Sequence, residues 1–171
     1  MENYIEKYKQ LRDDNIDLGI IGKGFISLYY NENVLNHDIH LLVNKNYRIL
    51  ELEGDFITDE KELLFDLQEK LRLPDYACSN YNALDDCLID YEIDENGVVL
   101  VFRHLNKVDP DTIRILVNVL ADHARSKFAI GQKLLTLIQV DNPKFKITDP
   151  IGAINFRLWN DKEWFEGDRR K

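Results

Sequence analysis

The stretch "LRLPDYACSNYNALDDCLID", residues 71–90, holds more information about this chain than any other. It contains four aspartates and two cysteines, and no basic side chain follows Arg72. Pro74 ends one helical pattern, and the spacing of apolar residues predicts a second helix near 80–90. Such a segment suits a carboxylate metal site, a catalytic acid pair, a redox site, or an anionic surface for a cationic partner.

A helical projection at about 100° per residue separates two sides of the second helix. The side expected to face the core is made by Tyr81, Leu84, Cys87 and Leu88. Asn82 and Asp86 lie near the opposite pole, one turn apart, and Asp85, Ile89 and Asp90 flank them. Residues 73–102 contain seven acidic residues and no Lys, Arg or His. We therefore expect an outward-facing acidic surface that nothing local neutralises.

The alternatives differ in how well they fit this surface. A catalytic pair needs two carboxylates in different environments, which neighbouring exposed aspartates do not supply. A Mg²⁺ or Ca²⁺ site needs oxygens that converge from several elements, and the EF-hand spacing is absent. A merely solvated helix face remains the strongest competitor. The segment has four aspartates and two asparagines, however, and both residue types are poor helix formers. Like charges one turn apart also destabilise a helix. Because these residues oppose local stability, we favour a functional use of their negative charge.

Composition narrows the class of partner. The formal net charge is −9, from 31 acidic and 22 basic residues, so phosphate repulsion argues against nucleic acid and anionic membranes. The charged N-terminus lacks the apolar core of a signal peptide, and no apolar run is long enough to span a membrane, so we expect a cytoplasmic protein. A basic protein or a small cation fits better.

No motif for catalysis or for a cofactor was found. Cys78 and Cys87 are nine residues apart, which is neither a redox motif nor a zinc set, and we expect free thiols. His37 and His40 form a local pair without further nearby ligands, which is a weak metal signal. Nucleophile-elbow, zinc-protease, Walker and dinucleotide motifs are absent. We expect no enzyme activity, no cofactor and no metal; an enzyme using carboxylate-bound metal is a distant alternative.

Hydrophobic periodicity predicts a small α/β domain with a largely parallel sheet. Strands are predicted at 47–54, 97–104 and 133–140, and helices at 2–13, 59–71, about 80–90 and 110–128. Residues 18–30 suggest a strand or hairpin, and 34–43 are ambiguous. Residues 142–171 suggest an irregular tail with one short strand at 154–159, packed on the domain by Trp159 and Trp164.

The segment "LPDYACSNYNALDDCLID" resembles the helix-loop-helix segment of the barstar family, whose pattern runs Leu-Pro-(Asp/Glu)-Tyr-Tyr-Gly-x-Asn-x-Asp-Ala-Leu-x-Asp-Cys-Leu. Ten positions match in register: Leu73, Pro74, Asp75, Tyr76, Asn80, Ala83, Leu84, Asp86, Cys87 and Leu88. The resemblance extends over the neighbouring predicted strands and helices, and the C-terminal residues look like the extension of longer members. The first 40 or so residues are not explained by it.

This resemblance implies an α/β fold with a three-stranded parallel sheet over residues 46–141, with residues 1–45 and 142–171 as extensions. It implies that the acidic helix and the preceding loop plug the active site of a ribonuclease, with carboxylates standing in for RNA phosphate. By position, Tyr76 would stack in or beside the cleft, Asn80 would contact it from the loop, and Asp86 would be the main phosphate mimic. The remaining implied partner-binding residues are Asn82, Ala83, Asp85, Asp90 and, by a looser alignment, Asp122.

Three departures from the family pattern bear on the partner. Asn82 replaces the first helix aspartate, which removes one charge, and Asp85 is expected to replace it in part. Ala77 and Cys78 stand where Tyr-Gly is usual. The leading interpretation is an inhibitor or immunity protein that blocks a basic ribonuclease toxin. The alternative is an interaction module of the same fold that binds a basic partner other than a nuclease.

Overall fold

The computed structural model describes residues 2–94, 96–147, 150–151, 158–163 and 167–170. Four strands form one sheet: β1 (Ile26–Tyr29), β2 (Arg48–Glu53), β3 (Val98–Arg103) and β4 (Leu134–Gln139). The α-helices are α1 (Glu2–Asp14), α2 (Ile16–Ile21), α3 (Glu32–Asn44), α4 (Glu60–Leu71), α5 (Tyr81–Asp90) and α6 (Pro110–Ala129). Short 3₁₀ turns are η1 (Gly54–Phe56), η2 (Asp75–Cys78) and η3 (Asp168–Arg170).

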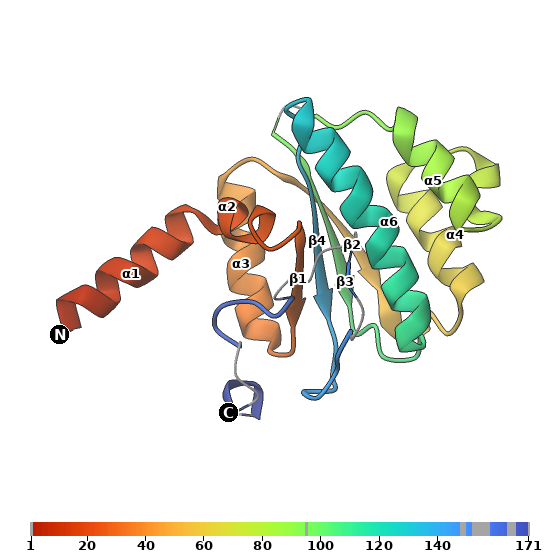
Figure 1. Cartoon of the computed structure of the whole chain (residues 1–171). Coiled ribbons are helices and arrows are strands. Elements are labelled where there is room, and N and C mark those ends of the chain that lie inside the picture. Colours follow the sequence, from red (N-terminus) through yellow and green to blue (C-terminus); the bar gives the residue numbers. More distant parts are fainter. Residues whose placement is uncertain (1, 95, 148–149, 152–157, 164–166, 171) are drawn as a thin grey trace.

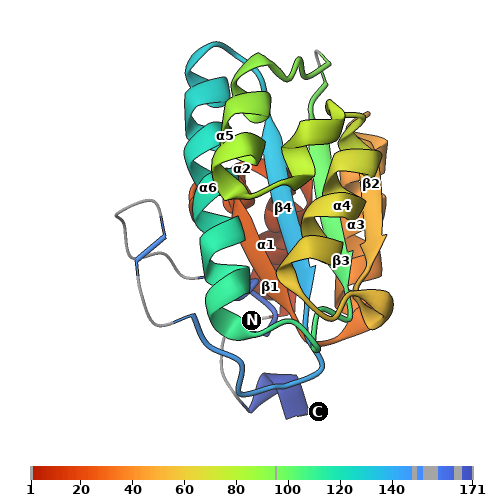
Figure 2. The same ribbon diagram turned by 90° about the vertical axis from the view of Figure 1, so that its right-hand side faces the viewer.

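The sheet is parallel throughout, in the order β1-β4-β3-β2. Helices lie on both of its faces: α4, α5 and α6 cover one, and α2 and α3 lie against the other (Figures 1 and 2). Strands covered on both faces need apolar residues at every position. The predicted strand at 97–104 has this property, and every residue from Val98 to Phe102 is fully buried.

The predicted strands and helices of the central region are confirmed within one or two residues. Asp59 caps α4, because its side chain accepts a hydrogen bond from the Glu62 backbone N–H at 2.9 Å. Asp109 caps α6 in the same way, with Pro110 at the first helical position. Arg72 ends α4 in a left-handed conformation at φ 55°, two residues before Pro74.

The expectation of a three-stranded sheet is wrong, because β1 pairs in parallel with β4 and makes a fourth strand. This strand comes from the N-terminal region that the resemblance does not explain. Residues 18–30 are therefore only in part a strand: Ile16–Ile21 is helical, and Gly24 and Phe25 at φ 89° and 71° turn the chain into β1. The ambiguous segment 34–43 is part of α3.

The C-terminal segment protects the free edge of β1. The Leu28 N–H donates to the Leu158 carbonyl, and the Asn160 N–H donates to the Leu28 carbonyl at 3.1 Å. Trp159 forms an isolated parallel bridge with Leu28. All four residues of β1 are buried as a result, although β1 is an edge strand. Most of the short strand expected at 154–159, together with Trp164, lies outside the described residues.

A candidate protein-binding surface on α5

The η2 turn and α5 position the residues that the sequence singled out. Leu84, Cys87 and Leu88 are buried, as the helical projection predicts, and Tyr81 is half-buried. The Tyr81 hydroxyl donates to the Thr112 carbonyl at 3.1 Å, which ties α5 to α6. Because this side is fixed against the domain, the opposite side of α5 is held toward solvent.

Asp86 and Asp90 are the exposed carboxylates of this surface. They are four residues apart, so both lie on the outer side of one helix. Among the described residues, no cationic group is found within ion-pair distance of either carboxylate. Their negative charges are therefore available to a cationic group from outside the chain.

Asp85, unlike Asp86 and Asp90, has an ionisable side chain of the same protein beside its carboxylate. Its carboxylate lies 2.8 Å from Nε2 of His123, whose side chain is only 10% exposed. As the sequence predicts, no basic residue lies within 73–102 itself, but residues from elsewhere in the chain reach two of its carboxylates. His123 on α6 lies beside Asp85 across 38 positions of the chain. The Arg48 guanidinium lies 3.4 Å from Asp94.

Asn80 has a structural role that the sequence-based site did not include. It is the N-cap of α5, and its side-chain oxygen accepts a hydrogen bond from the Ala83 N–H at 3.0 Å. One acceptor site of the side-chain oxygen is thus used by the helix, and the amide N–H groups are left for a partner. Asn82 is exposed beside it, and Ala83 is half-buried.

Tyr76 stands on η2 next to α5, with 59% of its surface exposed. Interaction with the Cys87 side chain is the main cause that raises the pKa of the Tyr76 hydroxyl, and the negative charges of Asp90 and Asp86 add to this effect. The Tyr76 hydroxyl therefore lies near the same carboxylates. Ile89 is 59% exposed on α5. The surface combines acidic groups with exposed apolar groups, a mixture typical of protein interfaces.

Asp122 lies on α6 and is exposed, but its carboxylate is 3.3 Å from the Arg125 guanidinium within the same helix. The structure thus leaves Asp122 partly neutralised, unlike Asp86. Of the predicted residues, Tyr76, Asn80, Asn82, Ala83, Asp85, Asp86 and Asp90 come from one continuous turn and helix. Asp122 comes from the helix that packs against α5 and is next in sequence to His123.

A groove of about 490 Å³ adjoins this surface where Cys78 meets the first turns of α4. Phe56 and Phe65 line it and are 80% and 52% exposed, and Asp59 and Asp66 add acidic groups. These aromatic residues are not among the binding residues predicted from the sequence. Phe65 lies between the predicted core positions Leu64 and Leu67 of the α4 helix, but its side chain faces outward.

Within the described residues, no group of three or more His, Cys, Asp or Glu side chains is arranged to hold a metal ion. Nor does any helix in the described part of the chain have the length and apolar character needed to cross a membrane. Both cysteines are free; Cys87 is buried and Cys78 is half-buried.

Comparison with known proteins supports the family seen in the sequence. A family model described as "Barstar (barnase inhibitor)" matches residues 47–139. No curated protein matches the chain in a sequence search.

Solved structures with a similar fold belong to much longer chains. One is Cdc6p from Pyrobaculum aerophilum, with 12% identity and a TM-score of 0.52 over 78% of this chain and 39% of that one. Another is Drosophila ORC bound to DNA, with 14% identity and a TM-score of 0.43 over 82% of this chain and 26% of that one. The first likeness concerns the fold alone, and the second is too low to carry an argument.

Proposed function

Because this chain belongs to the barstar family, we propose that it inhibits a basic ribonuclease by inserting the η2–α5 surface into the active site. The family model carries the description "barnase inhibitor", which supports an inhibitor role for the chain. The supporting observation is the pair of exposed carboxylates, Asp86 and Asp90, which have no cation of their own among the described residues. We further propose that the protein acts in the cytoplasm as an immunity protein against such a toxin.

The chemistry of a ribonuclease cleft explains why this surface fits it. Such a cleft holds Arg, Lys and His side chains that bind RNA phosphate, and a carboxylate can accept charge-assisted hydrogen bonds from the same groups. Asp86, one turn before Asp90, would occupy the phosphate position, and Tyr76 would stack beside it. Negative potential on this side of the protein would also accelerate the encounter with a cationic enzyme.

A second candidate function is binding of a basic protein that is not a nuclease. Two observations favour it. Asn82 replaces the first helix aspartate of the family pattern, and Asp85, the expected substitute, is already paired with His123 at 2.8 Å. The phosphate-mimicking surface therefore holds less free charge than the pattern provides.

The test uses barnase as a defined probe, together with basic proteins captured at low salt from an extract of the source cells. We expect the chain to bind and inhibit at least one ribonuclease. Substitution Asp86→Ala should weaken binding by about 2–5 kcal/mol, or roughly 30-fold to several thousand-fold, because a cation would stay buried without its partner. Asp75→Ala is the matched control and should change the affinity by less than about 1 kcal/mol.

Both variants should keep the unfolding midpoint of the wild type, since both carboxylates are exposed. Equal and minor effects of the two substitutions on a verified ribonuclease complex would remove the phosphate-mimic role from Asp86. If neither barnase nor any captured protein with ribonuclease activity binds, the inhibitor function is refuted and the second candidate is favoured.

A further inference from the structure

The N-terminal helix α1 projects away from the rest of the domain like an arm (Figure 1). Its apolar residues form a stripe in contact with solvent: Tyr4, Ile5, Tyr8 and Leu11 are 80%, 52%, 65% and 61% exposed. An isolated helix of 13 residues is only marginally stable in water, and most helices gain stability by packing an apolar face. Exposed apolar stripes of this kind mark interaction sites.

The spacing of the stripe is that of a helix made to pair with another helix. Tyr4, Tyr8, Leu11, Asn15 and Leu18 are separated by four, three, four and three residues, which is the alternation of the a and d positions of a heptad. Tyr4, Tyr8 and Leu11 belong to α1, Asn15 joins α1 to α2, and Leu18 belongs to α2 and is 56% exposed. Leu18 of α2 thus borders the C-terminal end of the stripe on α1.

The charges beside this stripe show which partner fits it. On one flank Arg12 is used within the domain, because its guanidinium binds the buried Asp38 at 2.8 and 3.1 Å. The other flank carries Lys7 and Asp14, which are exposed and seven residues apart. In an antiparallel pair of identical helices, Lys7 lies opposite Asp14 of the second copy, and this contact occurs twice. A parallel pair would place Lys7 opposite Arg12, a contact between like charges.

We propose that α1 is a dimerisation arm that pairs in antiparallel orientation with α1 of a second copy of this chain. The register that joins Lys7 to Asp14 places Tyr8 opposite Leu11, and Tyr4 opposite Asn15. Because the body of each copy is attached at the C-terminal end of its arm, the two bodies lie at opposite ends of the pair. This arrangement is a closed two-fold dimer.

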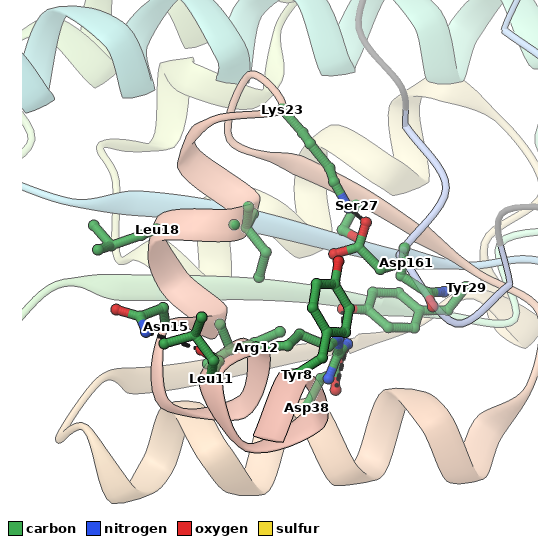
Figure 3. Close-up of a pocket in the computed structure, with 14 residues that line it drawn as sticks. Tyr8, Leu11, Arg12, Asn15, Leu18, Lys23, Ser27, Tyr29, Asp38 and Asp161 are labelled. Atoms are coloured by element: carbon green, nitrogen blue, oxygen red, sulfur yellow. Dashed lines mark hydrogen bonds and ion pairs between the residues drawn. The ribbon is translucent and has the colours of Figure 1, made fainter. Parts of the chain in front are cut away.

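A cavity in each copy receives the end of the other arm. It has a volume of about 440 Å³ and lies between α1, α2 and β1. Figure 3 shows Leu11, Asn15 and Leu18 on one side of it and Lys23 on the other. Since Tyr4 of the second copy lies opposite Asn15, its ring is placed at the mouth of this cavity, between Leu11 and Leu18. A tyrosine anchored in a pocket is a common source of binding energy at interfaces.

The cavity also offers a polar group for this tyrosine. Arg12 lines the cavity, and its buried Nε has no hydrogen-bond partner among the described residues. A hydroxyl that enters the cavity can accept a hydrogen bond from such a group. In the dimer the two α5 surfaces stay free, since α1 and α5 lie on opposite sides of the molecule (Figure 1). The dimer would therefore bind two partner molecules.

Sedimentation velocity of the whole chain tests this proposal from about 5 to 500 µM protein. We expect a monomer–dimer equilibrium with a dissociation constant on the order of 10–100 µM, as befits a small interface. Lys7→Glu and Asp14→Lys should each weaken dimerisation about 10-fold, because each replaces two attractive contacts by two repulsive ones. The double variant restores opposite charges and should return to within about 3-fold of the wild type.

Lys9→Glu is the matched control: it makes the same charge change on the same helix, one residue outside the stripe, and should shift the constant by less than about 3-fold. Tyr4→Ala should weaken the dimer about 10-fold or more while leaving the circular dichroism spectrum unchanged. A chain that stays monomeric at 500 µM overturns the proposal. So does a dimer that the double charge exchange fails to restore, because this result would exclude the antiparallel pairing of α1.

Discussion

Carboxylates at two ends of this molecule have opposite surroundings. At the junction of α1, β1 and α3, Asp38 is fully buried and is bound by Arg12 at 2.8 Å and by the Tyr29 hydroxyl at 3.0 Å. On α5, Asp86 is exposed and no cation of the described residues pairs with it. The acidic residues that give the net charge of −9 therefore do not all act in the same way. Paired acidic groups hold the N-terminal region to the sheet, and unpaired ones are left for a partner.

The largest effect on the unfolding free energy is expected at the buried ion pair of Arg12 and Asp38. Arg12→Ala leaves the buried Asp38 carboxylate with the Tyr29 hydroxyl and, among the cations of the described residues, with only Lys162 at 3.8 Å. Removal of one member of a buried ion pair typically costs about 3–5 kcal/mol, and we expect a loss of unfolding free energy in this range. Urea denaturation at neutral pH measures it.

Lys9→Ala is the control for this substitution, because Lys9 lies on the same helix and is exposed. It should change the unfolding free energy by less than about 0.5 kcal/mol. A loss below about 1 kcal/mol for Arg12→Ala would mean that α1 is not held to the domain by the Asp38 ion pair.

A smaller effect is expected at Asp17, a second buried carboxylate of the N-terminal region. Burial by itself raises the pKa of Asp17, but the hydrogen bond and charge of Lys45 and the Tyr47 hydroxyl outweigh it, so the pKa lies below its ordinary value. The ionised form therefore stabilises the fold at pH values above the unfolded pKa of about 3.9. This contribution is lost as the pH falls through the lower pKa of the folded state.

Asp17→Asn should accordingly lower the unfolding free energy by about 1–3 kcal/mol at pH 6, since hydrogen bonds to charged groups are lost. The gap between wild type and variant should narrow below about pH 4. Asp86→Asn, on the exposed surface, should show no such gap at either pH. If the gap at Asp17 is the same at pH 6 and pH 3, the ionised carboxylate is not what stabilises this region.

The smallest expected effect on the unfolding free energy tests whether Asn80, in the α5 surface, has a structural role. Asn80→Ala removes the N-cap of α5 and should cost about 1 kcal/mol of unfolding free energy. Asn82→Ala, two residues away and exposed, should cost less than about 0.5 kcal/mol. Asn80→Asp keeps an oxygen acceptor and should restore most of the loss. Equal stability of the two alanine variants would show that Asn80 acts as a surface residue rather than as a cap.

Local patterns in the sequence were sufficient for much of the fold. Periodicity and turn residues predict the strands at 47–54, 97–104 and 133–140 and the helices at 59–71, 80–90 and 110–128. The structure contains all of these elements. The buried side of α5 was predicted as well, because a helix repeats every 3.6 residues and Leu84 and Leu88 therefore share one side with Cys87. These properties depend on residues that are close in the chain.

The tertiary structure alone decided the contacts between distant segments. The fourth strand pairs Ile26 with Thr136, and the edge of β1 is covered by residues near 158–160. His123 reaches Asp85 across 38 positions, and Arg12 reaches Asp38 across 26. No local period encodes such pairs, since they arise only when helices and strands pack. The sequence therefore determined which residues of α5 face outward, and the packing of α6 against it decided which of their charges remain free.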